Sequence, residues 1–282
     1  MRYNIDMSKL DLHFLGCGAG FNPNYGSNSA YLNLPDRGVL LLECGEQTFA
    51  RLVNLPDFLN AKYLVVLLSH THSDHAGSLG NMVMHSYNVL HRRTTIGYGG
   101  LRQRREIKRL LRSFGVPREC YRLMSIDRVN DLISEHTNLN EGYISTEMTP
   151  TKHTNLLACY SINITRMGKG GRTDGIYWSG DTCEIEPMLD YLIMGYRVYQ
   201  EVSARHNPTH VNIQDLDKRL KELASSSQCR TNRPHVTSND KTLIGKVYSV
   251  EDLRRRITVM HLDSQRALYY AELLGYNVPE LV

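Results

Sequence analysis

The segment LVVLLSHTHSDHAG, residues 64–77, places a buried strand directly before four potential metal ligands. The apolar run at 64–68 is typical of a strand that is buried on both faces. The ligands that follow it are His70, His72, Asp74 and His75. Alternate side chains of an extended chain lie on the same side, so His70 and His72 can reach one cation. Asp74 and His75 follow where the chain turns into a helix, from which they can reach a second cation.

Three later segments supply candidates for the remaining ligands. They are His153 in TPTKHT, Asp181 in YWSGDT and His261 in TVMHLD, each at or near the end of an expected strand. A single histidine at a strand end is more often a hydrogen-bonded structural residue than a ligand. The combination is different, because imidazole nitrogen and carboxylate oxygen are ligands that catalytic zinc sites use. The sequence therefore predicts a metal site to which several strand ends contribute.

Expected strands and helices alternate along the chain. Strands are expected at 10–16, 29–34, 38–44, 63–68, 94–100, 142–154, 156–165, 176–182, 196–203 and 256–261, and helices at 46–55, 77–91, 105–115, 212–224 and 264–275. This order predicts an α/β fold in which two mixed β-sheets pack face to face with helices outside. We expect a single domain over 1–282 with two pseudo-halves, about 1–150 and 151–282.

Composition argues against a membrane protein and a disulfide-rich secreted protein. Of the 282 residues, 41% are hydrophobic and 22% are charged, which is ordinary for a soluble folded chain. The first segment, MRYNIDMSKLDLHFLG, lacks the apolar core of a signal peptide, and no run approaches the roughly 18 apolar residues of a membrane span. The six cysteines show no C-x-x-C spacing. We therefore expect a cytoplasmic protein with no membrane partner.

Positive charge is clustered at 101–112, where LRQRREIKRLLR carries six Arg or Lys. The apolar residues Leu101, Ile107, Leu110 and Leu111 fit one helical stripe only loosely and leave the basic residues on the outer face. Two interpretations remain open, a solvated basic helix and a surface that steers anions or faces RNA. The net charge of +4 suits an anionic substrate without requiring nucleic acid.

Glycine-rich residues 16–20, GCGAG, are followed by FNPNYGSNS and not by a helix. Gly16, Gly18 and Gly20 therefore indicate a loop that approaches the metal centre closely, and not a dinucleotide-binding fingerprint. Asn28 and Tyr98 are secondary candidates for contact with a substrate.

With these residues in place, the chain resembles the metallo-β-lactamase superfamily over nearly its whole length. The central motif is matched by His70, His72, Asp74 and His75, and the later ligand positions by His153, Asp181 and His261. The resemblance implies an αββα sandwich. It implies one metal on His70, His72 and His153, a second on Asp74, His75 and His261, and Asp181 as the bridge between them. The expected cofactors are two divalent cations, Zn²⁺ in first place and Mn²⁺ as the alternative.

Four segments narrow the resemblance to the ribonuclease Z-like branch, and within it most closely to the anti-Pycsar cyclic-nucleotide phosphodiesterases. They are FLGCGAGFN, LLLECGEQTFARL, LLSHTHSDHAGSLG and QEVSARHNPTHVNIQDL. The resemblance implies hydrolysis of nucleoside 3′,5′-cyclic monophosphates by a hydroxide between two metals, in a bacterial or phage-infected cell. It also implies a homodimer. Asp74 is expected to orient the hydroxide, His210 to contact phosphate or protonate the leaving oxygen, and Glu201 to orient His210. For His210 and Glu201 a purely structural role stays open.

Other functions remain open. A ribonuclease Z-like endoribonuclease would need an RNA-gripping arm, and the 27 residues between His153 and Asp181 leave room only for a strand, a turn and a strand. Nucleic acid is therefore not the expected partner. A lactonase or other ester hydrolase would keep the same ligands, and a nucleotide-sequestering protein with a structural metal is the non-enzymatic alternative. The polar segment 226–246 is expected at the surface, with a lid or dimer contact as its competing roles.

Overall fold

Two mixed β-sheets form the centre of the protein in this computed structural model, which describes residues 10–137, 142–168, 173–225 and 248–282. The first sheet has the order β1 (His13–Gly16), β2 (Ser29–Leu34), β3 (Gly38–Leu42), β4 (Tyr63–Leu67), β5 (Thr94–Tyr98) and β6 (Tyr121–Ser125). The strands from β1 to β3 pair antiparallel, and those from β3 to β6 pair parallel. Parallel pairing brings the carboxyl ends of β3 to β6 to one edge of the sheet.

The second sheet contains the later strands in the order β11 (Ile257–Met260), β10 (Arg197–Glu201), β9 (Thr173–Trp178), β8 (Tyr160–Met167) and β7 (Tyr143–Pro150). Here β7, β8 and β9 pair antiparallel, whereas β9, β10 and β11 pair parallel. The parallel part again brings three strand ends to one edge.

The two sheets pack face to face through one apolar core. Leu40 of β3 and Val65 of β4 belong to the same buried cluster as Ile162 of β8 and Trp178 of β9. The rings of Phe14 and Trp178 stack across this interface with centroids 5.8 Å apart. Burial of this many aliphatic and aromatic side chains is the main favourable contribution to packing one sheet on the other.

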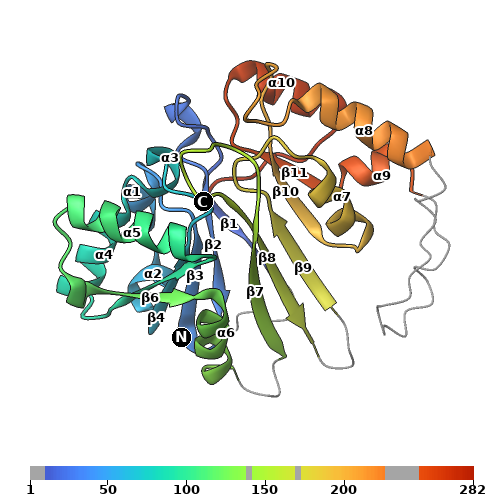
Figure 1. Cartoon of the computed structure of the whole chain (residues 1–282). Coiled ribbons are helices and arrows are strands. Elements are labelled where there is room, and N and C mark those ends of the chain that lie inside the picture. Colours follow the sequence, from blue (N-terminus) through green and yellow to red (C-terminus); the bar gives the residue numbers. More distant parts are fainter. Residues whose placement is uncertain (1–9, 138–141, 169–172, 226–247) are drawn as a thin grey trace.

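Helices cover both outer faces (Figure 1). Over the first sheet lie α1 (Thr48–Leu52), α2 (Pro56–Asn60), α3 (Ser73–Ala76), α4 (Leu79–Asn88) and α5 (Leu101–Ser113), and over the second lie α7 (Glu186–Ile193), α8 (Ile213–Ser225), α9 (Val250–Arg254) and α10 (Gln265–Leu274). Helix α6 (Ile126–Glu135) inserts Val129 and Ile133 into the core between the sheets. The predicted αββα sandwich is therefore confirmed. In the described ranges, no helix is long and apolar enough to cross a membrane.

Some elements differ from the expectation. The helix expected at 46–55 is shorter than predicted, because α1 covers only Thr48–Leu52. Leu55 is extended, and Pro56 starts a second short helix, α2, beyond the expected range. Helix α5 begins at Leu101 and not at residue 105, and Leu101 itself is exposed, so it does not belong to the buried stripe. The buried residues of α5 are Gln103, Ile107 and Leu111. Three-residue 3₁₀ helices occur at Pro23–Tyr25, Pro35–Arg37 and Arg118–Cys120, the last labelled η3. The polar segment 226–246 lies outside the described residues.

Candidate metal centre

Strand ends from both sheets meet at the candidate metal centre. His70 and His72 follow β4, and Asp74 and His75 lie in α3, the single helical turn behind them. His153 follows β7, Asp181 follows β9, and His261 directly follows β11. The structure thus brings together all seven residues that the sequence predicts as metal ligands. Short loops at the carboxyl ends of strands hold these side chains, and the two packed sheets fix the distance between the loops.

The first group of ligand atoms consists of His70, His72, His153 and Asp181, all within 4.8 Å of one another. The Nε2 atom of His70 lies 2.8 Å from Nδ1 of His72, and Nε2 of His153 lies 3.4 Å from the same atom. Asp181 faces this group through Oδ2, which lies 3.7 Å from His153 Nε2. Three imidazoles and one carboxylate oxygen are a suitable donor set for a divalent transition metal.

The second group consists of Asp74, His75, His261 and again Asp181, also within 4.8 Å. Nε2 of His261 lies 3.0 Å from Oδ2 of Asp74. Asp181 faces this group through its other oxygen, Oδ1, which lies 3.1 Å from His75 Nε2 and 3.4 Å from His261 Nε2. One carboxylate therefore presents one oxygen to each group.

Unpartnered buried atoms indicate that the groups suit a cation. His75 Nε2 and Asp181 Oδ1 are both buried, and neither forms a well-directed hydrogen bond, although they lie only 3.1 Å apart. Buried polar atoms without partners are uncommon and costly, typically 1–3 kcal/mol each as an order of magnitude. A metal between them would satisfy both atoms, so the residues fit the ions that the sequence predicts.

The ionisation of the ligands differs between the two groups. Burial and the neighbouring His75 hold the pKa of His70 well below its ordinary value, which keeps its imidazole neutral. Burial would also lower the pKa of His261, but Asp181, Asp74 and Glu201 outweigh it and raise this pKa to about 10. Burial would raise the pKa of Asp181, but the surrounding imidazoles, His261 and His75 foremost, lower it. The carboxylates stabilise a proton on the imidazoles of the second group, and a metal that binds there has to displace it.

Glu43 lies directly behind the centre and is a residue that the sequence analysis did not single out. It is 0% exposed directly after β3, and its carboxylate accepts the Ser69 N–H (3.1 Å) and the Trp178 Nε1–H (3.3 Å). Its Oε1 also lies 3.4 Å from His75 Nδ1. Glu43 thus fixes the side of the His75 ring that faces away from the ligands, as carboxylates behind ligating histidines commonly do. An acidic residue directly after an apolar strand was the signal available in the sequence.

His153 is oriented in a similar way. Its Nδ1–H donates to the carbonyl oxygen of Thr209 over 2.9 Å, which leaves Nε2 free to face the other ligands. Because Thr209 immediately precedes His210, the loop that orients His153 also carries the next candidate residue.

His210 and Glu201 lie beside the two groups. Glu201 is buried at the end of β10, where Oε1 accepts the backbone N–H groups of Thr182 and Val211 and Oε2 lies 3.0 Å from His210 Nδ1. Burial would lower the pKa of His210, but Glu201 raises it. Asp181, Glu201, His210 and His261 also form a third set of ligand-type atoms within 4.8 Å.

The glycine-rich loop approaches the centre as expected. A Cβ atom on Gly20 would lie 3.1 Å from the carboxylate of Asp74, so a larger residue there would press on this ligand.

Asn28 is fully buried, and both polar atoms of its amide lack hydrogen-bond partners. Tyr98 does not lie at the centre but lines a separate groove on the first sheet. The 27 residues between His153 and Asp181 include β8 and β9, the two strands that the spacing predicts, and the turn expected between them lies mostly outside the described residues.

Comparison with solved structures defines the class of protein as a metallo-β-lactamase fold protein. The metallo-β-lactamase fold protein YhfI from Bacillus subtilis aligns with a TM-score of 0.56 at 14% identity, covering 95% of both chains. The short form of human tRNase Z aligns with a TM-score of 0.55 at 14% identity, covering 96% of this chain and 97% of the other. Zn²⁺-bound PqqB from Methylobacterium extorquens aligns with a TM-score of 0.53 at 13% identity, covering 96% and 97%.

Comparison of sequences assigns the chain to one family of proteins. The family described as anti-Pycsar protein Apyc1 matches residues 10–231, and the chain belongs to this family. An anti-Pycsar protein Apyc1 from Bacillus phage 010DV004 is 23% identical over 252 residues, covering 82% of this chain and 90% of the relative. Another from Bacillus phage BSP38 is 24% identical over 243 residues, covering 81% and 89%.

Replacing Glu43 tests whether it supports the centre. We expect Glu43→Gln to weaken divalent metal binding by about 10- to 100-fold, because an amide lacks the charge that holds the His75 imidazole. Competition with a chromogenic chelator measures this change. Glu135→Gln, an exposed position at the end of α6, is the matched control. An unchanged affinity in a folded Glu43→Gln protein would show that Glu43 only supports packing.

Proposed function

We propose that the protein is a metal-dependent phosphodiesterase that hydrolyses nucleoside 3′,5′-cyclic monophosphates. The observation that carries the proposal is the Asp181 carboxylate, which presents one oxygen to each of two histidine-rich groups. Two-metal sites of this kind suit displacement at phosphorus. Membership of the anti-Pycsar protein Apyc1 family supports a role against Pycsar defence, for which a cyclic nucleotide is the matching substrate.

In this proposal the chain's own residues hold, orient and protonate the reactants. His70, His72 and His153 would hold one divalent cation and Asp74, His75 and His261 the other, with Asp181 shared between the two groups. When bound, such cations lower the pKa of water towards neutrality and neutralise charge on phosphoryl oxygens. Asp74 orients the attacking water towards phosphorus.

Ring opening then requires one proton at the leaving oxygen. The attacking water loses one proton to solvent as its oxygen forms a new bond to phosphorus. One ester P–O bond breaks, and the freed sugar oxygen takes a proton from His210, which regains one from solvent. Glu201 is a positioning residue in this step, because it holds His210 Nδ1 at 3.0 Å and leaves the other ring nitrogen available. The product is a 5′- or 3′-monophosphate, according to which ester bond breaks.

Zinc is the expected metal and manganese the alternative, since the donor set is imidazole and carboxylate. The named relatives come from Bacillus phages, so we propose action in the cytoplasm of an infected bacterial cell. The homodimer that the family resemblance implies stays a prediction, which light scattering would check.

A substrate panel tests the proposed reaction. Protein loaded with Zn²⁺ or Mn²⁺ is incubated with cyclic mononucleotides, cyclic dinucleotides, precursor transfer RNA and a lactone. We expect turnover of the cyclic mononucleotides and a loss of at least about 100-fold in His72→Ala, because a metal ligand is removed. His206→Ala, at a side chain 76% exposed to solvent, is the control. Cleavage of RNA or lactone with intact cyclic mononucleotides would instead establish one of the alternative functions.

A second experiment separates proton donation by His210 from metal binding by His210. For His210→Gln we expect kcat to fall by about 10²- to 10⁴-fold, because the leaving oxygen loses its proton donor. Metal affinity should stay within a few-fold of the parent protein, and His206→Gln should change neither quantity. If metal affinity and kcat fell together, His210 would be a ligand and the proposed proton transfer would be wrong.

A further inference from the structure

The positive charge of the chain is concentrated away from the metal ligands. Residues 91–128 carry eleven Arg or Lys and only three Asp or Glu, a net charge of +8 against +4 for the whole chain. The remainder of the protein is therefore net negative. Segregation of charge on this scale creates a local potential that attracts polyanions.

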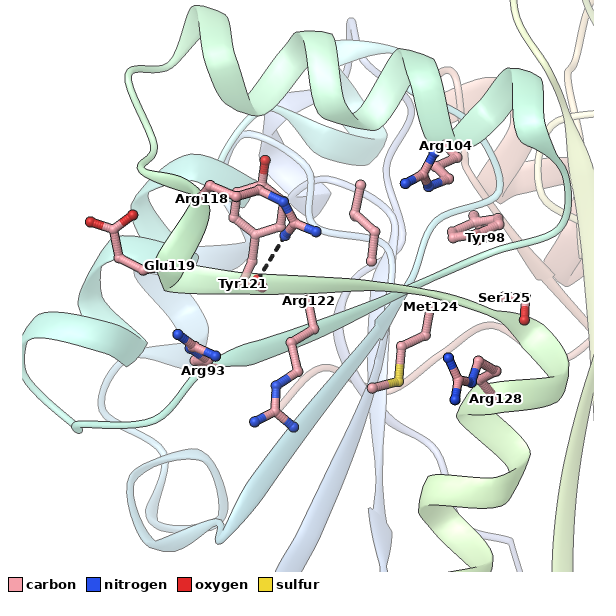
Figure 2. Close-up of a pocket in the computed structure, with 11 residues that line it drawn as sticks. Arg93, Tyr98, Arg104, Arg118, Glu119, Tyr121, Arg122, Met124, Ser125 and Arg128 are labelled. Carbon is pink, nitrogen blue, oxygen red and sulfur yellow. Dashed lines mark hydrogen bonds between the residues drawn. The ribbon is translucent and has the colours of Figure 1, made fainter.

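A groove runs through the centre of this region, along β6, the edge strand of the first sheet (Figure 2). Its volume is about 770 Å³. Five arginines line it, from the loop before β5, from α5, η3, β6 and α6: Arg93, Arg104, Arg118, Arg122 and Arg128. Glu119 is the single acidic residue of the lining. We call these residues the basic groove.

The arginines of the basic groove lack acidic partners. In the part of the chain that the structure describes, none of the five forms an ion pair within 4.0 Å, and all five are exposed. Four more exposed and unpaired cations continue from it along α5: Arg105, Lys108, Arg109 and Arg112. Arg102 differs, since it pairs with Glu106 at 3.1 Å. Nine unpaired cations on adjacent elements repel one another, and an anionic ligand would remove that repulsion.

We propose that the basic groove binds single-stranded nucleic acid through its phosphodiester backbone. Arginine is well suited to bidentate contact with phosphate. Arg122 of β6 pairs in register with Thr95 of β5, and Arg93 lies two residues before Thr95. The two arginines therefore lie one after the other along the edge of the sheet. Tyr98 adds a half-buried aromatic ring, with the Arg104 guanidinium 5.9 Å from its centroid. Cations along the backbone and an aromatic ring for a base are the elements of single-strand binding sites.

Protection of the sheet edge and binding of an acidic peptide each fit this charge pattern less well. Charged side chains commonly protect an edge strand from pairing with another chain, but this role would explain Arg122 and not the cations on α5 and α6.

An acidic peptide could add to the edge of β6 as a further strand. There, however, Arg118 already donates to the Tyr121 carbonyl over 3.0 Å and its guanidinium lies 4.8 Å from the centroid of the Tyr121 ring. Arg118 therefore already occupies the first backbone carbonyl of β6, with which an added peptide strand would have to pair.

Helix α5, which carries part of the basic groove, contacts the loop of His153 at its first turn. Arg102, at the start of α5, donates to the carbonyl oxygen of Asn155 over 2.9 Å, two residues beyond His153. None of the predicted metal ligands lines the basic groove. The proposed surface is therefore separate from the centre, and its function does not depend on the phosphodiesterase proposal.

Binding of labelled oligonucleotides tests the inference. Fluorescence anisotropy is measured with the metal-loaded full chain and short single-stranded RNA and DNA, over a range of salt concentrations. Engagement of five arginines predicts that log K falls with log salt with a slope of about −3.5. Arg122→Glu combined with Arg128→Glu should weaken binding by about tenfold or more and reduce the magnitude of the slope by about 1.4. Arg93→Gln combined with Arg104→Gln is a second, uncharged replacement at the same surface.

Matched variants separate the basic groove from other surfaces. Arg255→Glu combined with Arg266→Glu removes the same charge at exposed positions near the second sheet, and should leave binding within about twofold. His72→Ala, which alters the metal centre, should also leave binding unchanged. Equal losses in the two charge-reversal pairs would overturn the proposal, as would binding that depends on His72. Binding of an acidic peptide or of anionic vesicles with no binding of either oligonucleotide would overturn it too.

Discussion

The carboxylate of Asp181 is where the strand ends of the two sheets meet. It follows β9 of the second sheet, yet its oxygens face imidazoles that follow β4, β7 and β11. A buried carboxylate is stable only when cations or hydrogen-bond donors surround it. The arrangement therefore depends on the packing of one sheet on the other, because a shift between the sheets would separate Asp181 from His70 and His75.

Two further buried carboxylates orient histidines of the centre. Glu43 ties the His75 loop to Trp178 of the second sheet, and Glu201 ties His210 to the backbone at Thr182 and Val211. Both residues directly follow or end a strand of one sheet and contact residues distant in sequence. The same packing that forms the apolar core thus also sets the orientation of the imidazoles. In the proposed mechanism, this preorganisation is what allows the centre to act on a compact phosphodiester.

The sequence predicted the parts of this arrangement that follow from local pattern. The apolar run before His70 and the positions of His153, Asp181 and His261 at strand ends sufficed to bring seven ligand candidates together. Non-local contacts were not predictable. Glu43 depends on Trp178, 135 residues later, and Gln103 is buried in α5 because it bonds to Leu68 and Gly99. Strand β6 was missed because an edge strand that exposes Arg122 lacks a clear apolar pattern.

The proposed function requires Asp181 to lie between two bound cations. Anomalous diffraction from crystals grown with Zn²⁺, recorded on both sides of the zinc absorption edge, tests it most directly. We expect two peaks roughly 3.5–4 Å apart, one at His70, His72 and His153 and the other at Asp74, His75 and His261, with one Asp181 oxygen near each. A single peak, or a peak held by Glu201, His210 and His261, would contradict the account.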